Sequence, residues 1–570
     1  MPGKKIATAV PDWEDRLITK RSIIPPPIFP QEAESALAVF KSLRVPDIPG
    51  RPTFGEICRP WMFDFVRLIF GAYDVSDGPF GRQLINDFFL LISKKNAKST
   101  LAAGIMVTCL LRNDRPNAEL LIIAPTKEVA DNSARPAIAM VSAEPELARR
   151  IKLEPYHRRL INKLTDSELK IVAADTSSVA GKKASYVLAD EWWQLAKLPR
   201  AEDMWLEATG GLSSRPEGFT LKLTTHSNEP PVGMMRADLK RFRAIRNGSL
   251  VQPNACGVLY EFPERMLDDG SFREPENWYI TNPNLGASTS EVFIAQKIAE
   301  AEGGDGDEGN TLGVFAKYLN VEIRLNLRSD RWCGSDYWSG LGDRTLTYDS
   351  LLARCKTVAI GVDGGGRDDL LGVAALGIDS ATGKWLCWVH AWAHKEALAL
   401  RKSEGSRYAD YVLDGDLTIV NDFDQDVTDV LGIVKKAIES RKFCGIGVDR
   451  NGFSSFLPAL AEIGITAESG LGMEVTQGLA LSGDIESLER KLVDGQFAHS
   501  ASAMMSWMVS NVKVVPLRNA FMFEKQRAGT DKIDGVMAMI NATTVLIRNP
   551  EPRGASIYNS AARNRGLIRL

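Results

Sequence analysis

The stretch INDFFLLISKKNAKSTLAAG, residues 85–104, decides the fold of the first half of the chain. A run of strand formers leads to Lys98 and Ser99, and small residues typical of a helix start follow. This is the order of a phosphate-binding loop, GxxxxGK[S/T], in which backbone N–H groups, a Lys and a hydroxyl bind phosphate and its metal. Both glycines are replaced, by Ile92 and Ala97. Taken alone, the motif fits a nucleotide site and a polar turn equally well.

Four further apolar runs alternate with helical patterns up to about residue 230. They are AELLIIAPT, SELKIVAAD, ASYVLADE and GFTLKLTTHS. Each is short and is followed by polar residues, which predicts a parallel sheet with helices on both faces. The segment 54–74 is expected to form one amphipathic helix, and residues 240–335 are expected to be mostly helical.

One of these runs, in SYVLADEWW, ends in two adjacent acids. Such an Asp holds Mg²⁺ in nucleotide hydrolases, so Asp190 is the candidate metal ligand and Glu191 the candidate to polarise water. The other interpretation, a strand that ends in surface acids, is the weaker one beside Lys98. The run LTTHS contains Thr224 and Thr225, which suit a γ-phosphate sensor, although by themselves they favour a strand-to-turn transition.

A different pattern begins near residue 351. The runs TVAIGVDGGG, LLGVAALGID and KWLCWVHAWA are joined by short turns, which force antiparallel neighbours. A helical stretch at 427–440 and the apolar run FCGIGVDR follow, with a connection long enough for a parallel strand. Three antiparallel strands followed by such a unit predict a ribonuclease H-like fold.

Three acids lie on separate predicted elements of this second half. Asp363 lies in AIGVDGGG, Asp449 ends the strand of CGIGVDRNG, and Asp534 lies in DKIDGVMAMINA, where a helix with small residues begins. Cleavage of phosphodiesters by two metal ions needs converging carboxylates, and Mg²⁺ or Mn²⁺ prefers oxygen ligands. The other interpretation is a turn at Asp363 and helix N-caps at Asp449 and Asp534.

Length and composition narrow the class of protein. A chain of 570 residues with 44% hydrophobic and 25% charged residues predicts two or more globular domains. The net charge of −3 means that any polyanion must bind at a local basic patch. Seven scattered cysteines without a CxxC pair fit a reducing compartment and argue against structural zinc. With no secretory signal and no apolar run of about 18 residues, we expect a soluble cytosolic protein.

Together these motifs resemble the large subunit of a tailed-bacteriophage DNA-packaging terminase, over about residues 54–545. SKKNAKST resembles the Walker A motif of that family, in which the first Gly is normally absent. APTKEVADNSARP resembles its second ATPase motif, VLADE its Walker B and TTHS the motif that couples hydrolysis to movement. GVDGGGRDDL, GVDRNG and KIDGVMAMINA resemble its three nuclease motifs.

The resemblance implies a role for each matching residue. The expected nucleotide-site residues are Trp61 stacking on adenine, Lys94 as a basic finger in cis, Asn96, Ala97, Lys98, Ser99, Thr100 and Asp190, with Glu191 catalytic and Thr224 and Thr225 coupling. The expected metal ligands are Asp363, Asp449 and Asp534, with Asp369 as a weaker fourth. Lys525 is expected either near DNA phosphate and the carboxylates or as a plain surface lysine, and His499 is expected to order a turn rather than bind metal.

The family resemblance also implies a function. ATP with Mg²⁺ would drive DNA into a prohead, and an endonuclease with two Mg²⁺ or Mn²⁺ ions would cut concatemeric viral DNA. Its partners would be double-stranded DNA, the portal protein and a small terminase subunit, with the chain as a ring on the prohead and no membrane. It would act in the host cytoplasm and be absent from the mature virion.

The expected organisation follows from these motifs. We expect an extended Pro-rich segment at 1–50, an α/β P-loop ATPase domain at 51–335 with a helical lid or linker subdomain from about 240, a linker at 336–350, and a ribonuclease H-like nuclease domain at 351–570. Two alternatives stay open: an ATP-driven translocase with a non-catalytic C-terminal binding domain, and a structural adaptor of the capsid vertex with vestigial sites.

Overall fold

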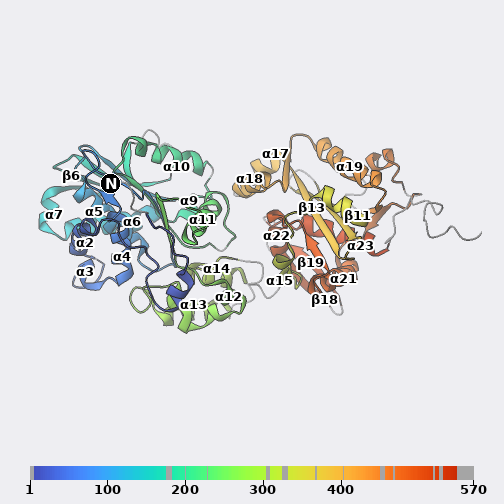
Figure 1. Ribbon diagram of the computed structural model, residues 1–570, viewed down its shortest axis with the longest axis horizontal. Coiled ribbons are helices and arrows are strands. Elements are labelled where there is room, and N and C mark those ends of the chain that lie inside the picture. The colour runs from blue at the N-terminus through green and yellow to red at the C-terminus, as the bar shows by residue number, and fades with distance from the viewer. Residues whose placement is uncertain are drawn as a thin grey trace, which may run out of the picture. The chain divides into compact units, whose positions relative to one another are not determined.

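The computed structural model describes most of the chain, in two compact units, Met1–Ile323 and Arg324–Leu570 (Figure 1). The described residues are 6–45, 47–174, 183–198, 200–227, 229–302, 308–323, 331–365, 369–401, 404–449, 456, 458–466, 469–517, 520–525 and 531–548. Within these ranges, no helix has the length and apolar character needed to cross a membrane.

The N-terminal segment contains two helices, so the expectation of an extended chain over residues 1–50 is wrong. They are α1 (Trp13–Ile18) and α2 (Pro30–Ser42). Pro30 lies in the first turn of α2, where a missing N–H breaks no helical hydrogen bond. Leu37 and Phe40 of α2 are fully buried, and this burial stabilises the helix.

Residues 54–74 form two helices and a short strand instead of one helix. They are α3 (Phe54–Ile57), α4 (Pro60–Phe70) and β1 (Tyr73–Asp74), which pairs with β2 (Arg82–Gln83). Pro60 disfavours helical torsions at Arg59, which has φ −71° and ψ 152°, and itself starts the second helix.

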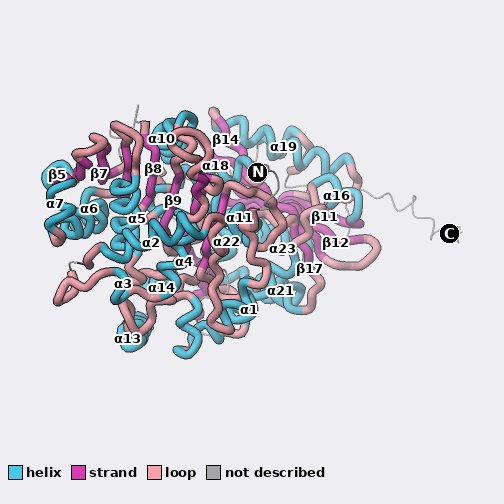
Figure 2. Tube along the Cα trace, turned by 60° about the vertical axis from the view of Figure 1, so that its left-hand side comes forward, coloured by secondary structure: helices cyan, strands magenta, loops and turns pink. Residues whose placement is uncertain are grey.

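The first unit is built on an eight-stranded sheet with the order β10-β3-β9-β8-β4-β7-β6-β5. Its strands are β3 (Asp87–Leu91), β4 (Glu119–Ala124), β5 (Ile151–Glu154), β6 (Arg159–Asn162), β7 (Ser167–Ala173), β8 (Ala184–Ala189), β9 (Phe219–Thr224) and β10 (Ala255–Leu259). The pairs from β10 to β7 are parallel, as predicted, and β5 and β6 extend the sheet antiparallel. Figure 2 shows β8 and β9 side by side.

Helices connect and cover these strands. They are α5 (Lys98–Arg112), α6 (Lys127–Ser142), α7 (Pro145–Arg150), α9 (Trp192–Leu195), α10 (Ala201–Thr209) and α11 (Gly233–Arg246). Leu239 and Phe242 of α11 pack with Phe89 and Leu91 of β3 in one buried cluster. The region after 240 is not only helical, because β10 adds a parallel edge strand beside β3. It continues with α12 (Glu264–Asp268), α13 (Glu291–Glu302), α14 (Glu308–Tyr318) and short 3-10 turns at Ser271–Arg273 and Pro275–Ile280.

The second unit contains a seven-stranded sheet with the order β14-β13-β12-β11-β15-β16 and β17 beside β13. Its strands are β11 (Cys355–Gly364), β12 (Leu370–Asp379), β13 (Trp385–His394), β14 (Leu417–Val420), β15 (Phe443–Asp449), β16 (Gly472–Val475) and β17 (Phe497–His499). The β11–β12–β13 meander is antiparallel and β15 is parallel to β11. This arrangement confirms the predicted opening of a ribonuclease H-like fold.

Helices cover both faces of this sheet. Buried residues of α21 (Ser482–Val493), α22 (Ala503–Ser510) and α23 (Asp534–Arg548) form one core with the sheet, and those of α16 (Tyr348–Arg354) and α19 (Phe423–Glu439) form another. The remaining elements are α15 (Ser335–Trp338), α17 (Lys395–Leu400), α18 (Gly405–Leu413), 3-10 turns at Ser339–Leu341 and Gly478–Leu481, and the hairpin β18 (Val512–Leu517) and β19 (Ala520–Lys525).

The segment 336–350 is part of the second unit, although the sequence predicted a linker there. Trp338 of α15 is fully buried, its ring lies 4.0 Å from that of His499, and Leu346 is 3% exposed. Trp338 belongs to the core on one side of the sheet, and Leu346 belongs to the core on the other side. Apolar burial therefore holds this stretch against the sheet.

Candidate active sites

The loop between β3 and α5 has the geometry of a phosphate-binding loop with substituted glycines. The backbone N–H of Ile92 donates to the Thr224 carbonyl at 3.1 Å, and the Ile92 side chain is fully buried, so this residue extends the strand without needing a glycine. Ala97 is left-handed, with φ 58° and ψ 29°, directly before α5. Of the two replaced positions, only Ala97 therefore has a backbone conformation that favours glycine.

Lys98 begins α5 beneath this loop. Its ammonium donates to the Ser93 carbonyl at 3.3 Å, and the residue is only 6% exposed. Burial lowers the pKa of Lys98, while the carboxylates of Glu191 and Asp190 oppose that shift. A buried cation beside two carboxylates at a helix N-terminus is suited to bind an anionic phosphate.

Asp190 and Glu191 follow β8. Asp190 is fully buried and accepts a hydrogen bond of 2.9 Å from Ser133. Burial and Glu191 raise the pKa of Asp190, whereas hydrogen bonds from Ser99 and Ser133 lower it. The Walker A hydroxyl and the Walker B carboxylate are therefore adjacent, which fits a shared Mg²⁺.

The backbone of Glu191 is left-handed, with φ 56° and ψ 54°. Its carboxylate accepts a hydrogen bond of 2.8 Å from the indole of Trp193. A non-glycine residue in this conformation costs stability, and such strain is found at many functional sites. Trp193 thus fixes the candidate general base.

Thr224 connects the ends of three elements. Its carbonyl accepts from Ile92 after β3, and its hydroxyl accepts from the Trp193 backbone N–H at 3.1 Å and donates to the Thr225 carbonyl at 3.0 Å. Thr224 is fully buried and Thr225 is 2% exposed. The predicted coupling residues therefore lie between the strand that leads to the phosphate loop and the helix that follows Glu191.

Asn96 is held by residues that the sequence did not single out. Its side chain donates to the Asn282 side chain at 2.9 Å and accepts from the Asn284 backbone at 3.0 Å. Trp61 donates its indole N–H to the Asn284 side chain at 2.8 Å and is 7% exposed. Trp61 therefore supports the loop through Asn284, and its expected stacking on adenine stays a prediction. Lys94 is exposed.

In the second unit, four carboxylates line one cleft of about 300 Å³. Asp363 lies near the end of β11, Asp449 ends the parallel neighbour β15, Asp534 begins α23 and Asp369 precedes β12. Because neighbouring parallel strands end at the same edge of a sheet, Asp363 and Asp449 lie close together. Gln477 and Lys525 line the same cleft.

The position of Asp534 depends on close packing between α23 and the sheet. A Cβ atom on Gly361 would lie 1.9 Å from the Ala538 carbonyl oxygen, and one on Gly372 would lie 2.7 Å from the Asp534 carbonyl carbon. Neither position has room for a side chain. The amide of Asn541 on the same helix donates to the Val362 carbonyl at 2.8 Å.

The carboxylate cluster fits a divalent cation. Asp534 is 2% exposed, and its Oδ2 has no hydrogen-bond partner among the described residues. Burial and the neighbouring acids raise the pKa of Asp363 well above its usual value, and burial and Asp369 raise that of Asp534. Hard cations such as Mg²⁺ prefer carboxylate oxygens, and one bound here would offset this repulsion.

Two lysines and a glutamine complete the cleft. Lys532 is 3% exposed and forms an ion pair with Asp369, while Lys525 lies 3.8 Å from Asp369 and 4.0 Å from Asp534. Lys525 is therefore near the carboxylates, one of its two expected positions. The Gln477 amide lies 3.5 Å from the Asp363 carboxylate. Sequence reasoning missed Lys532 and Gln477, although Lys532 is only two residues before Asp534.

His499 has a structural position. Its Nε2 lies 2.7 Å from the Trp338 carbonyl, and its Nδ1 accepts from the Ala501 backbone N–H at 3.2 Å. Burial lowers the pKa of His499, while the hydrogen bond to the Trp338 carbonyl opposes that shift. Both ring nitrogens have partners, which agrees with the expectation that His499 orders a turn.

A P-loop ATPase unit followed by a ribonuclease H-like unit with converging acids defines a class of protein that couples nucleotide hydrolysis to cleavage of DNA. Two family models match the chain: the terminase large subunit ATPase domain over residues 68–240 and the terminase large subunit endonuclease domain over residues 258–549. The chain therefore belongs to the terminase large subunit family. It is a hydrolase of ATP and DNA that acts in viral DNA packaging.

Two relatives illustrate the similarity. The large terminase subunit of Enterobacteria phage HK97 is 23% identical over 499 residues, which cover 86% of this chain and 91% of the relative. The crystal structure of the HK97 large terminase is 20% identical, covers 90% of this chain and 99% of its own, and has a TM-score of 0.46. The structure of a large terminase from a thermophilic bacteriophage is 11% identical. The alignment covers 90% of this chain and 98% of the terminase chain, with a TM-score of 0.30. The alternative of a non-catalytic C-terminal binding domain is wrong, because the family model matched there is an endonuclease domain.

Proposed function

We propose that Lys98, Ser99 and Asp190 bind ATP with Mg²⁺, and that Glu191 acts as general base toward the attacking water. Support comes from the buried ammonium of Lys98 beside two carboxylates and from the Ser99 side chain, whose interaction with Asp190 lowers the pKa of that carboxyl. The indole of Trp193 orients the Glu191 carboxylate. Thr224 would transmit the state of the site, since it bonds to both flanking motifs.

In the second unit, Asp363, Asp449 and Asp534 would hold two Mg²⁺ or Mn²⁺ ions. The observation that carries this proposal is the buried Asp534 Oδ2, which lacks a hydrogen-bond partner within the described residues and lines one cleft with the other two acids. Bound metal would stabilise the attacking and leaving oxygens of a DNA phosphodiester. Asp369 is the weakest ligand candidate, because Lys532 already neutralises it.

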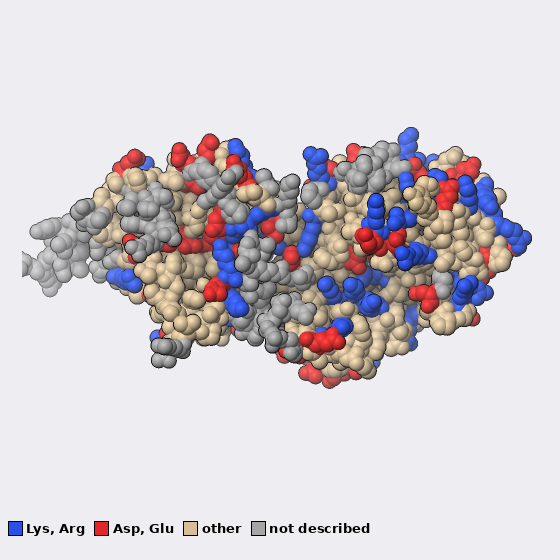
Figure 3. Space-filling view, turned by 180° about the vertical axis from the view of Figure 1, so that it is seen from behind, with Lys and Arg blue, Asp and Glu red and all other residues tan. Residues whose placement is uncertain are grey.

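The same family membership supports the proposed partners. We propose double-stranded DNA as substrate, the portal protein and a small terminase subunit as partners, a homo-oligomeric ring on the prohead, and action in the host cytoplasm. The net charge of −3 requires local contacts to DNA, and basic side chains gather in several small patches on the face shown in Figure 3.

Parallel assays of ATP hydrolysis and plasmid cleavage test these assignments. Lys98→Ala and Glu191→Gln should lower ATP turnover at least about 100-fold, because each removes a group that acts on the γ-phosphate or its water. Lys240→Ala, an exposed lysine on α11, is the matched control. ATP hydrolysis by Lys98→Ala at the parent rate would show that the phosphate site is misplaced.

For the nuclease, Asp449→Asn keeps the shape but removes a charge that the metal needs. It should lose plasmid cleavage and keep ATP hydrolysis. Asp494→Asn, an exposed acid at the end of α21, should cut at the parent rate. Cleavage that resists EDTA would exclude the metal assignment.

A further inference from the structure

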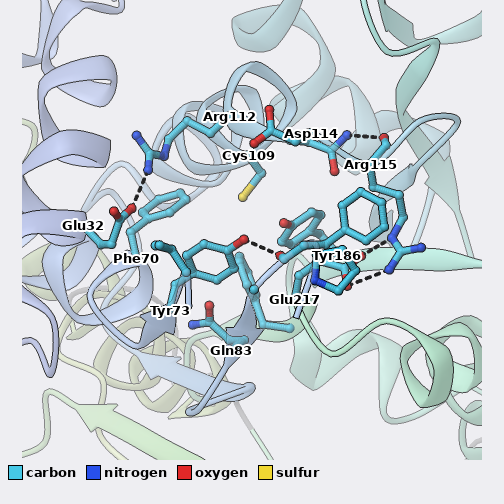
Figure 4. Close-up of a pocket in the computed structure, with 16 residues that line it drawn as sticks. Glu32, Phe70, Tyr73, Gln83, Cys109, Arg112, Asp114, Arg115, Tyr186 and Glu217 are labelled. Carbon is cyan, nitrogen blue, oxygen red and sulfur yellow. Dashed lines mark hydrogen bonds and ion pairs between the residues drawn. The ribbon is translucent and has the colours of Figure 1, made fainter. Parts of the chain in front are cut away.

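A pocket of about 410 Å³ lies in the first unit, at the ends of three elements that carry catalytic motifs at their other ends (Figure 4). Arg112 lines it from the last turn of α5, which Lys98 begins. Phe219 lines it from the start of β9, which Thr224 ends, and Tyr186 lines it from the first half of β8. Its volume is in the range of small-molecule sites.

Aromatic rings form part of the pocket wall, beside charged side chains. Tyr73, Phe80, Tyr186 and Phe219 contribute rings, and those of Tyr186 and Phe219 meet edge to face with centroids 5.1 Å apart. The guanidinium of Arg115 lies 4.2 Å from the centroid of the Phe80 ring. Such a wall favours a flat aromatic ligand, which gains offset or edge-to-face contacts beyond its buried area.

The cationic side chains of the wall are already compensated. Arg112 pairs with Glu32 at 2.9 Å, and Arg115 forms two hydrogen bonds to Glu217, one of them 3.1 Å long. Figure 4 shows both pairs on the rim of the pocket, with the thiol of Cys109 pointing inward. An anionic ligand would have to break one of these pairs, so the pocket suits an uncharged molecule.

The Tyr186 hydroxyl is available to a ligand, and the exposed Asp114 carboxylate also lines the pocket. The hydroxyl of Tyr73 donates to the Phe80 carbonyl, whereas that of Tyr186 has no hydrogen-bond partner in the described part of the chain. A hydroxyl can donate one hydrogen bond and accept others. A ligand with one polar ring atom would satisfy it.

We propose that this pocket binds an uncharged one- or two-ring aromatic heterocycle, which stacks against the aromatic wall and forms a hydrogen bond to the Tyr186 hydroxyl. The proposal goes beyond ATP hydrolysis and DNA cleavage, because neither needs this end of the sheet. Since α5, β8 and β9 extend from the pocket to the phosphate loop, Asp190 and Thr224, an occupant would contact the elements that carry these motifs.

The test measures the binding of benzimidazole, used as the probe, to the full chain. Binding is measured by a titration with ligand-detected saturation-transfer NMR. Excess ADP with Mg²⁺ keeps the nucleotide site filled, and benzimidazole should bind with unchanged affinity in its presence. Tyr186→Phe, which keeps the ring, should weaken binding about five-fold through loss of one hydrogen bond. Phe80→Ala, on a surface loop, should weaken it by about the same factor through loss of one ring contact.

Tyr156→Phe is the matched control, because Tyr156 is 91% exposed and lies outside the pocket. It should bind benzimidazole like the parent chain, and thermal unfolding confirms that every variant is folded. Three results would overturn the proposal: no saturation transfer up to the solubility limit, displacement by ADP, or equal affinity in the parent, Tyr186→Phe and Phe80→Ala chains.

Discussion

Ala97 is the residue at which the phosphate loop can be tested most directly. A left-handed backbone costs a non-glycine residue about 1–2 kcal/mol, and β-branched side chains suffer most. Ala97→Gly should therefore keep ATP turnover and lose no stability, whereas Ala97→Val should lose at least about 1 kcal/mol and most of its activity. Urea unfolding and ATP hydrolysis measure the two effects. A fully active Ala97→Val chain would mean that the loop does not wrap closely around phosphate.

A second prediction at the scale of single residues concerns Asp363 and the stability of the chain without metal. Because its pKa is raised in the folded chain, ionisation of Asp363 destabilises the fold, and this loss appears as pH rises through the raised pKa. At pH 8 without metal, Asp363→Asn should unfold about 2 °C or more above the parent. The same variant should lose the rise in unfolding temperature that Mg²⁺ gives the parent. Equal stabilisation of both chains by Mg²⁺ would place the metal elsewhere.

At the scale of elements, the packing of α23 against β11 and β12 sets the nuclease geometry. Gly361→Ala should cost about 1–3 kcal/mol and strongly reduce plasmid cleavage, because its Cβ would displace the helix that carries Asp534. Gly432→Ala is the control: Gly432 is exposed in α19, a Cβ there meets nothing within 4 Å, and alanine should add up to about 1 kcal/mol. Unfolding assays measure the change in stability of both variants, and plasmid nicking assays measure the change in cleavage. A Gly361→Ala chain that cuts normally would contradict this account.

Sequence patterns were sufficient for most elements and insufficient for others. The strand that precedes Asp190 and the strand that carries Asp363 were predictable because a buried parallel or meander strand has a short apolar run between polar turns. Helix α2 was missed because the prolines of IIPPPIFP were interpreted as extended chain, although the last of them, Pro30, lies in the first turn of the helix, where proline is compatible with it. Strand β10 is only five residues long and lies among helical patterns.

Some residues of the candidate sites were likewise predictable from the sequence, and others were not. Three acids at element ends were predictable from chemistry and position. Lys532 and Gln477 were not, because only tertiary packing brings them to the cleft. The hydrogen bond of Trp61 to the distant Asn284 was not predictable for the same reason.

For the whole molecule, the start of the second unit decides whether it functions alone. Trp332 and Trp338 are fully buried in its core, and Trp332 donates to Glu489 at 2.7 Å. A fragment that begins at residue 331 should therefore fold and nick plasmid with Mg²⁺ and without ATP. One that begins at residue 346 lacks both tryptophans and should be less stable by several kcal/mol, as losses of about 3–5 kcal/mol accompany removal of one buried large aromatic ring. Equal unfolding midpoints would show that these side chains are dispensable.

The close packing of α23 against the glycines of β11 and β12 also bears on the order in which a newly made chain gains ATP hydrolysis and DNA cleavage. Asp363 and Asp449 belong to strands that leave the ribosome well before Asp534, and domains generally fold in order of synthesis. A nascent chain without α23 therefore lacks part of the core of the second sheet and one of its proposed metal ligands. We therefore expect DNA cleavage only from chains in which α23 has docked.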